Sequence, residues 1–265
     1  QVLFDGTLGF GKGLFGDVLT DHIVTSDGGH MSDPVAHLPS ANLTDCTDLM
    51  DRVRWIKTPE EVELLKKGAD LLDEVYLEVF PTVRPGDTER DVHARIVEGC
   101  IRRGANWVHG ILNTSRNDVA YGGEGDMAFQ SGDIIRNDYV SYLNGYPGHQ
   151  SRTVVIGEPT KELLDTYKTH RDIYRGTIDM CRPGAKASDI YHFSNNAFND
   201  AGFKGKVNIA GHGVGAWWHQ QEPYMVPSGK HILEKGMVVA LEPHIGHWHL
   251  QDMVLITEAA PLLLS

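Results

Sequence analysis

The stretch GDIIRNDYVSYLNGYPGHQSRTVVIG, residues 132–157, predicts the strand pair around which the rest of the fold is arranged. Apolar residues lie on both sides of the dipeptide Asn144-Gly145. This dipeptide is the strongest short signal for a two-residue type I′ turn, in which both residues have positive φ. We therefore expect an antiparallel hairpin with Asn144 and Gly145 at its tip.

The turn also predicts which side chains of the hairpin face each other. Counting outward from it, Val140 lies opposite His149 and Asp138 lies opposite Ser151. Because residues two apart on a strand share a face, all four side chains should project from one side. Asp138 and His149 would then be diagonal neighbours, close enough to share an ion or a substrate.

Two helices are predicted before the hairpin. Thr58, Pro59 and Glu61 form a helix start, with threonine as the N-cap, proline at the first helical position and glutamate completing a capping box. Apolar residues then recur at helical spacing until RPGD, residues 84–87, interrupts the pattern. A second helix should follow and end near Arg103.

The chain contains an internal repeat. RPGDTERDV from Arg84 matches RPGAKASDI from Arg182, and the same spacing maps Gly104 onto Gly202. Each copy reads as a turn, a helix that ends near a glycine, and strand-like sequence. The shared landmarks favour duplication over chance similarity of two helix starts, and they predict two related halves with a site between them.

Two later segments carry candidate catalytic residues. GHGVGAWWH, residues 211–219, places His212 between glycines that let another group approach the backbone closely. GMVVALEPHIGHWHLQDMVLITE, residues 236–258, alternates apolar residues and predicts two strands. Glu242 interrupts the first of these runs, and a buried carboxylate is costly unless it is paired or used. The run HIGHWH, residues 244–249, either supports the site or forms a surface loop.

Composition narrows the class of protein. The chain has 265 residues, of which 41% are apolar, and a formal net charge of -12. The acidic balance argues against nucleic-acid and membrane partners, and we expect a small-molecule substrate. The three cysteines have no paired spacing, which predicts reduced thiols and a cytoplasmic location. Residues 1–52 are loop-like and predict a partial N-terminal domain or linker, followed by a catalytic domain over 53–265.

In their order and spacing, these motifs resemble the pita-bread enzymes, which include methionine aminopeptidase, aminopeptidase P, prolidase and creatinase. The resemblance covers about residues 50–262. It implies an α+β pita-bread fold, with two pseudo-symmetric halves around a curved antiparallel sheet and a remnant of an N-terminal domain. Because that domain lends substrate contacts across a dimer in such relatives, the resemblance also implies a homodimer.

The resemblance identifies the positions of metal ligands. Metallopeptidases of this kind bind two ions through Asp, Asp, His, Glu and Glu. Asp138, His212 and Glu242 keep these residue types, whereas His149 replaces the second Asp and Gln251 replaces the last Glu. The two lost carboxylates are the pair that bridges the ions and offsets their mutual repulsion. A two-metal site is therefore not expected.

Two alternatives remain for the cofactor. In one, a single divalent ion is held by His149, His212 and Glu242, a donor set that suits zinc, iron or manganese. In the other no metal is bound, as the resemblance to creatinase implies, although creatinase's catalytic His falls on Tyr121 here and its other Glu falls on Ser151. Because glutamine is a poor ligand and the acidic bridge is gone, the sequence favours the metal-free alternative.

The leading functional hypothesis is a hydrolase that cleaves a C–N bond of a small polar amide, a ureido or amidino compound, or a short peptide. In it Glu242 activates water, His212 and His219 polarise the carbonyl or protonate the leaving nitrogen, and Asp138 and His149 orient each other. The predicted substrate contacts are Tyr121, Trp217, Trp218, Gln251 and Arg152. The alternatives are an Xaa-Pro-type peptidase with one ion and a non-catalytic peptide-binding module.

Overall fold

The computed structural model describes residues 47–117, 123–216 and 221–265, and four short strands before them. These strands are β1 (Val2–Phe4), β2 (Ile23–Val24), β3 (His30–Met31) and β4 (Leu43–Asp45). The chain divides into two compact units, Gln1–Trp55 and Ile56–Ser265. In the first unit β1 pairs with β4, β2 pairs with β3, and helix α2 spans Thr47–Trp55.

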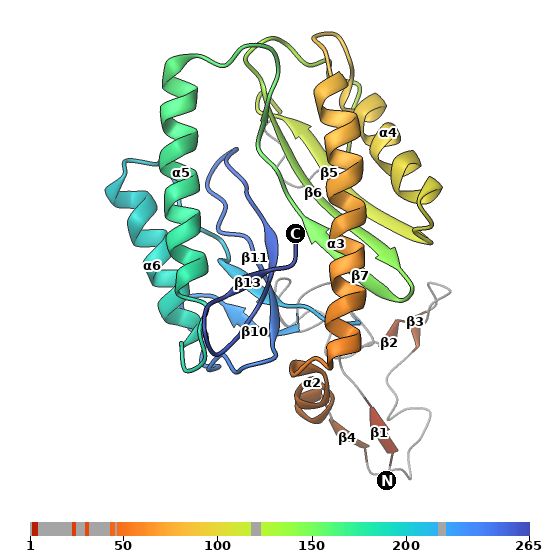
Figure 1. The fold of residues 1–265 in the computed structure, drawn as a ribbon, viewed down its shortest axis with the longest axis vertical. Coiled ribbons are helices and arrows are strands. Elements are labelled where there is room, and N and C mark those ends of the chain that lie inside the picture. Colours follow the sequence, from red (N-terminus) through yellow and green to blue (C-terminus); the bar gives the residue numbers. More distant parts are fainter. Residues whose placement is uncertain are drawn as a thin grey trace. The chain divides into compact units, whose positions relative to one another are not determined.

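The second unit contains the predicted hairpin, formed by β6 and β7 (Figure 1). Its helices are α3 (Pro59–Val79), the 3-10 helix η3 (Phe80–Thr82), α4 (Glu89–Arg102), α5 (Lys161–Asp179) and α6 (Ala187–Asp200). Its strands are β5 (Trp107–Thr114), β6 (Ile134–Leu143), β7 (Tyr146–Gln150), β8 (Val154–Val155), β9 (Gly211–Gly213), β10 (Gln221–Met225), β11 (Val238–Leu241), β12 (Asp252–Leu255) and β13 (Leu262–Leu263).

These strands form two antiparallel sheets. One has the order β5-β6-β7, with β8 also paired to β6, and the other has the order β10-β9-β11-β12-β13. In Figure 1, α3 and α4 lie on the side of the first sheet, and α5 and α6 on the side of the second. The predicted α+β class is therefore confirmed, and the predicted last two strands are β11 and β12, with β13 as an additional edge strand.

The internal repeat is present in the structure. Helices α4 and α6 begin and end at corresponding positions, 89 and 187 at one end and 102 and 200 at the other. The glycines that flank them match as well. Gly86 and Gly184 have φ of 100° and 88°, and Gly104 and Gly202 have φ of 95° and 83°. Because residues with a side chain seldom adopt such φ values, these glycines set the turns in both halves.

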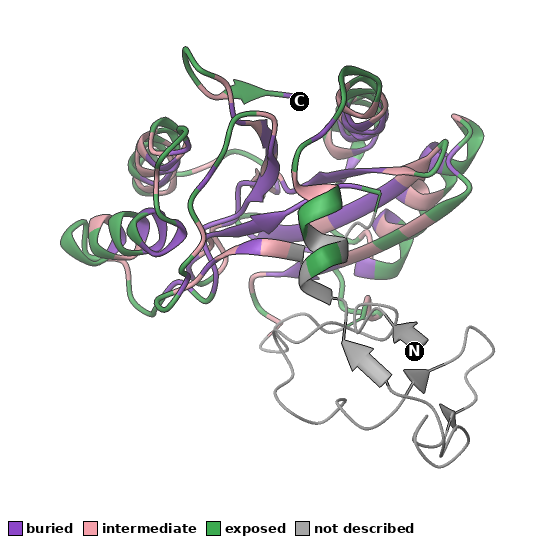
Figure 2. Ribbon diagram, turned by 90° about the horizontal axis from the view of Figure 1, so that it is seen from below, coloured by how far each residue is buried: buried purple, intermediate pink, exposed green. Residues whose placement is uncertain are grey.

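Helix α3 begins as predicted. Glu61 N donates to Thr58 Oγ1 at 3.3 Å, and Thr58 N donates to Glu61 Oε2 at 2.8 Å, which completes the capping box with Pro59 at the first position. The helix buries one face against the sheets, with Leu65, Leu72 and Val75 fully buried. Figure 2 shows that buried residues lie along the strands and on the helix faces that are turned toward them.

The hairpin also forms as predicted around Asn144 and Gly145, whose φ values are 54° and 83°. Val140 pairs with His149, so the predicted register is correct over this part of the ladder. Beyond it, the ladder is interrupted at Asp138 and Ser151 and resumes in the same register, with Ile135 paired to Val154 and Ile134 to Val155.

The β6–β7 ladder ends at Tyr139 and Gln150. Ser151 forms an antiparallel bridge with Gln251, with N–O distances of 3.2 and 3.1 Å in the two directions. At Ser151 the backbone therefore pairs with the second sheet, between the two stretches that pair with β6.

Helix α3 touches strand β7 through two glycines. A Cβ placed on Gly148 would lie 2.0 Å from Gly68 O, and one placed on Gly68 would lie 2.5 Å from Gly148 N. Nearby, Tyr76 Oη donates to Gln150 O at 2.9 Å, and Ser141 Oγ donates to Gly68 O at 3.5 Å. Because side chains alternate along a strand, the face opposite to this helix carries Asp138 and His149.

Among the described residues, no helix combines the length and the apolarity that a crossing of the membrane requires.

Gly148→Ala should destabilise the fold by about 3 kcal/mol, because the new methyl group meets rigid backbone instead of a movable side chain. Urea or thermal unfolding measures the loss. Gly123→Ala is the control: its Cβ would have no atom within 4 Å, and its unfolding free energy should change by less than about 0.5 kcal/mol. Equal stability of the two variants would contradict the close helix–strand contact.

His170 of α5 is fully buried and stacks on Phe198, with ring centroids 5.2 Å apart. Burial lowers its pKa to about 4. The unfolded chain therefore binds the His170 proton first, and stability falls as pH drops from about 6.5 toward 4, by about 2 kcal/mol at pH 5. His170→Phe should remove this contribution, so the variant gains about 2 kcal/mol relative to wild type between pH 7 and pH 5. The exposed His192→Phe should follow the wild-type pH trend.

Candidate functional site

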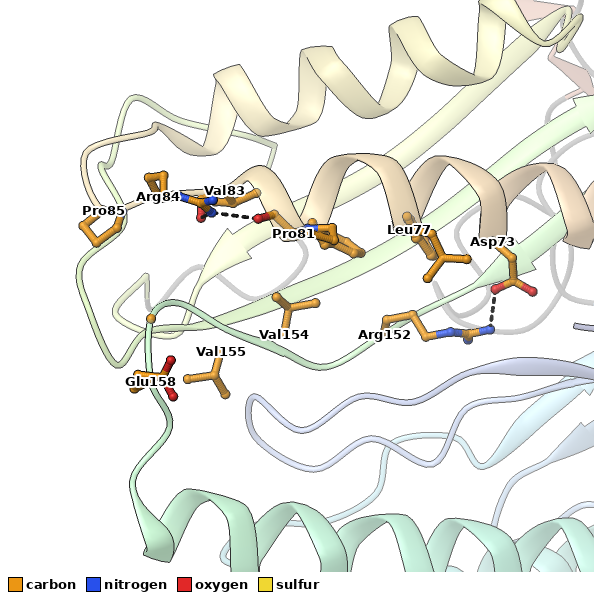
Figure 3. A pocket seen from close by; sticks show the side chains of 13 residues that line it. Asp73, Leu77, Pro81, Val83, Arg84, Pro85, Arg152, Val154, Val155 and Glu158 are labelled. Atoms are coloured by element: carbon orange, nitrogen blue, oxygen red, sulfur yellow. Dashed lines mark hydrogen bonds and ion pairs between the residues drawn. The ribbon is translucent and has the colours of Figure 1, made fainter.

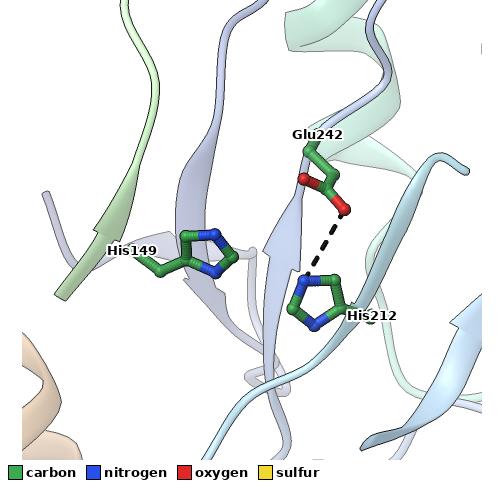
Figure 4. Close-up of side chains that lie close together, drawn as sticks. All are labelled: His149, His212 and Glu242. Atoms are coloured by element: carbon green, nitrogen blue, oxygen red, sulfur yellow. Dashed lines mark ion pairs between the residues drawn. The ribbon is translucent and has the colours of Figure 1, made fainter. Parts of the chain in front are cut away.

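Three potential metal ligands meet between the two sheets. His149 lies on β7, His212 lies on β9, and Glu242 directly follows β11; one donor atom from each lies within 4.8 Å of the others (Figure 4). All three residues are buried. Their convergence confirms the geometry on which the single-ion alternative depends.

The strand pairing places His212 and Glu242 side by side. His212 pairs with Ala240 across the β9–β11 ladder, and Glu242 N donates to Ala210 O at 2.9 Å. His212 Nε2 lies 3.6 Å from Glu242 Oε1. Both side chains are therefore fixed by the backbone of the second sheet.

Hydrogen bonding fixes the tautomer of His212. Its Nδ1 lies 2.9 Å from Gly213 O, and a carbonyl oxygen can only accept, so Nδ1 carries the proton. In the neutral ring, the lone pair then lies on Nε2, which is the atom closest to Glu242. A lone pair and a carboxylate oxygen repel each other in a buried site unless a proton or a cation lies between them.

His149 is held from the side of the hairpin and from the second sheet. Its Nε2 lies 3.1 Å from Asp138 Oδ1 and 2.9 Å from Gln251 Nε2, and Ser151 Oγ donates to Gln251 Oε1 at 2.8 Å. Its Nδ1 is buried and makes no hydrogen bond to the described residues. A histidine that contacts a carboxylate through one ring nitrogen and keeps the other for an ion is the usual arrangement in metal sites.

The site contains two carboxyl groups, those of Glu242 and Asp138, that lie close to each other. Burial raises the pKa of Glu242 well above its usual value, and the negative charge of Asp138 raises it further. Two nearby carboxylates in a buried position favour either a shared proton or a cation. Two imidazoles and one carboxylate form a donor set that zinc and similar divalent ions accept with an open position for water. The residues therefore fit a single ion.

One predicted site residue, Arg152, lies apart from the donor cluster. Its guanidinium pairs with Asp73 and Asp252, at 2.9 Å in both cases. Arg152 and Asp73 help to line a surface groove of about 580 Å³ beside α3 (Figure 3). The remaining candidates Tyr121, Trp217, Trp218 and His219 lie outside the described residues.

The HIGHWH run is more buried than a surface loop would be. His249 is only 1% exposed, and its ring centroid lies 5.0 Å from that of His244. Burial lowers the pKa of His249 to about 3. Sequence reasoning also missed Ser151 as the partner of Gln251, because the two residues lie 100 positions apart in the chain.

The part of the chain that contains the site is similar in sequence to a known protein family. The profile of Metallopeptidase family M24 matches residues 63–258. The chain is 31% identical over 221 residues to a probable dipeptidase, PepE, of Mycobacterium tuberculosis, which covers 80% of this chain and 59% of the relative. It is 25% identical to an Xaa-Pro dipeptidase of Pyrococcus furiosus, covering 80% and 63%. The chain thus spans less than two thirds of the length of these relatives.

Solved structures agree with the fold. Dipeptidase PepE from Mycobacterium ulcerans superposes with a TM-score of 0.78 at 30% identity, over 88% of this chain and 65% of that one. A prolidase from Pyrococcus horikoshii gives a TM-score of 0.77 at 23% identity, over 84% and 66%. The predicted pita-bread fold is confirmed by these similarities.

Gln251→Glu should place a third carboxylate next to Asp138 and Glu242. Without an ion, the like charges should lower the melting temperature. With one, the added charge should strengthen binding of Mn²⁺ or Zn²⁺ at least about tenfold, as measured by calorimetry.

The control is Gln150→Glu, which adds the same charge on the other face of β7. It should lower stability without tighter ion binding. Equal ion affinity of Gln251→Glu and wild type would show that this amide does not face the donor cluster.

Proposed function

The chain belongs to metallopeptidase family M24, and from this premise we propose that it hydrolyses the peptide bond of a dipeptide or short peptide with one divalent ion. The residues that would hold the ion are His149, His212 and Glu242. The observation that carries the proposal is that the donor atoms of these three buried side chains lie within 4.8 Å of one another. The names of the relatives, dipeptidase and Xaa-Pro dipeptidase, support a peptide substrate.

A bound divalent ion would polarise the peptide carbonyl and lower the pKa of a water molecule. The chain supplies the remaining chemistry. Glu242 has two carboxylate oxygens, so one could hold the ion while the other accepts a proton. It can take the proton of the attacking water and return it to the leaving amine.

Asp138 and Gln251 act on this chemistry through His149. Both contact Nε2 of that ring, from opposite sheets, and so fix the plane of the imidazole. Because the ring is fixed before a substrate arrives, no reorganisation of this ligand accompanies the reaction. Asp138 also keeps the pKa of Glu242 raised through its charge.

A metal-free, creatinase-like hydrolase is the second candidate, and it was the one that the sequence favoured. The contacts of Gln251 support it, because Ser151 Oγ donates to its Oε1 and its Nε2 lies 2.9 Å from His149 Nε2 without an ion between them. In that case Glu242 and His212 would carry out acid–base catalysis alone. The two candidates share the same residues and differ in the ion.

Purified protein should contain one divalent ion per chain, and a chelator should abolish its hydrolysis of Ala-Pro or Ala-Ala until Zn²⁺, Mn²⁺ or Co²⁺ is added back. Glu242→Gln should lower kcat/KM about 10³-fold, because it removes both a ligand and the proton acceptor. Glu234→Gln, at an exposed position before β11, is the matched control and should leave kcat/KM unchanged.

Elemental analysis and the chelator series separate the candidates. Hydrolysis that persists in ion-free protein would establish the metal-free candidate. Binding of one ion without hydrolysis of any dipeptide would contradict a peptidase.

A further inference from the structure

Three aromatic side chains continue the face of the first sheet that carries the site. Trp107 pairs with Tyr142 across the β5–β6 ladder, His109 pairs with Val140, and Val140 pairs with His149. Residues directly opposite each other share a face, as do residues two apart on one strand. Trp107, His109 and Tyr142, here called the aromatic strip, therefore lie on the same face as His149.

The side chains of the aromatic strip contact one another and remain partly exposed to solvent. Trp107 is 43% exposed, His109 is exposed and Tyr142 is half-buried. The rings of Trp107 and His109 are stacked, with centroids 5.9 Å apart and an interplanar angle of 10°, and Tyr142 meets Trp107 edge-on at 5.7 Å. Large rings on a sheet face that is otherwise buried against protein are typical of a binding surface.

The strip lies close to β7, which carries His149, and also contacts the segment that follows β9, which carries His212. His109, Val140 and His149 form one row across three strands, so about 10 Å separates the backbones of His109 and His149. On the other side, Tyr142 Oη donates to Ala216 O at 3.0 Å, four residues after His212. An extended peptide advances about 3.4 Å per residue, so a side chain one or two residues from the cluster reaches the strip.

We propose that the aromatic strip binds an aromatic side chain of the peptide substrate, in a residue next to the bond that is cleaved. This inference rests on the proposed function for the position of that bond. The expected gains in binding affinity favour an aromatic over a cationic side chain. Covering an aromatic side chain strengthens binding by roughly 10- to 100-fold, with a further gain from ring contacts, whereas a cation–π contact at an exposed site strengthens it by roughly 2- to 5-fold.

Binding of uncleavable ligands tests the strip without depending on catalysis. The probes are reduced-bond (CH₂–NH) analogues of Phe-Ala, Ala-Phe, Lys-Ala, Ala-Lys and Ala-Ala, titrated into the full chain by calorimetry. One of the two phenylalanine analogues should bind at least tenfold more tightly than the Ala-Ala analogue. Trp107→Ala should reduce this preference to threefold or less, and Trp107→Phe should retain most of it.

The matched control is Leu77→Ala, which also removes an exposed apolar side chain, one that is 77% exposed on α3. It should leave the affinities for all five analogues unchanged. The melting temperature of each variant shows whether it is folded. If Trp107→Ala is not folded, Trp107→Leu takes its place in the titrations.

The outcomes are distinct from those for the proposed function. If phenylalanine analogues bind no more tightly than Ala-Ala, if lysine analogues bind best, or if the preference survives loss of the Trp107 ring, the strip is not the binding surface. Hydrolysis of the parent dipeptides is measured separately, so a catalytically silent protein that still shows the ring-dependent preference contradicts the peptidase and supports the strip.

Discussion

The site depends on one backbone contact, the antiparallel bridge between Ser151 and Gln251. Its two hydrogen bonds, of 3.2 and 3.1 Å, join the sheet that carries His149 to the sheet that carries His212 and Glu242. Arg152, the next residue, reinforces the joint because its guanidinium pairs with Asp73 of α3 and Asp252 of β12. Tyr174 Oη donates to Asp252 at 2.9 Å and ties helix α5 to the same point. Without this joint, the donors would belong to separate sheets, and no cluster would exist.

Charge limits what such a joint can hold. Two divalent ions about 3.5 Å apart repel by roughly 20 kcal/mol even at an effective dielectric constant of about 20. Asp138 and Glu242 supply at most two negative charges, and Gln251 and the neutral form of His149 supply none. One divalent ion brings the same charges to neutrality, and so does a pair of protons. The cluster therefore suits either a single ion or acid–base catalysis.

The parts of the fold that could be predicted from sequence are those set by local chemistry. The Thr58–Glu61 capping box and the Asn144–Gly145 turn each involve residues within three positions of one another, and both appear as expected. The contact between Asp138 and His149 followed from that turn. The Ser151–Gln251 bridge joins residues 100 positions apart, and no local signal specifies it. The aromatic strip was missed for the same reason, since the register of β5 against β6 is set across a long connection that begins at Thr114.

The two neutral residues at the centre of the site, His149 and Gln251, depend on each other. One core cluster lies within the first half, and the other joins Leu65 of α3 to Ala240 and Met253 of the second sheet. His149 comes from one half and Gln251 from the other, and they lie 2.9 Å apart. A carboxylate at only one of these positions would face Asp138 or Glu242 in a buried site without a second ion to offset it. Two neutral groups that bond to each other keep the halves in contact and remove that repulsion. His149 and Gln251 thus join the two halves without a shared ion, and Glu242 and the two histidines are the proposed reactive part.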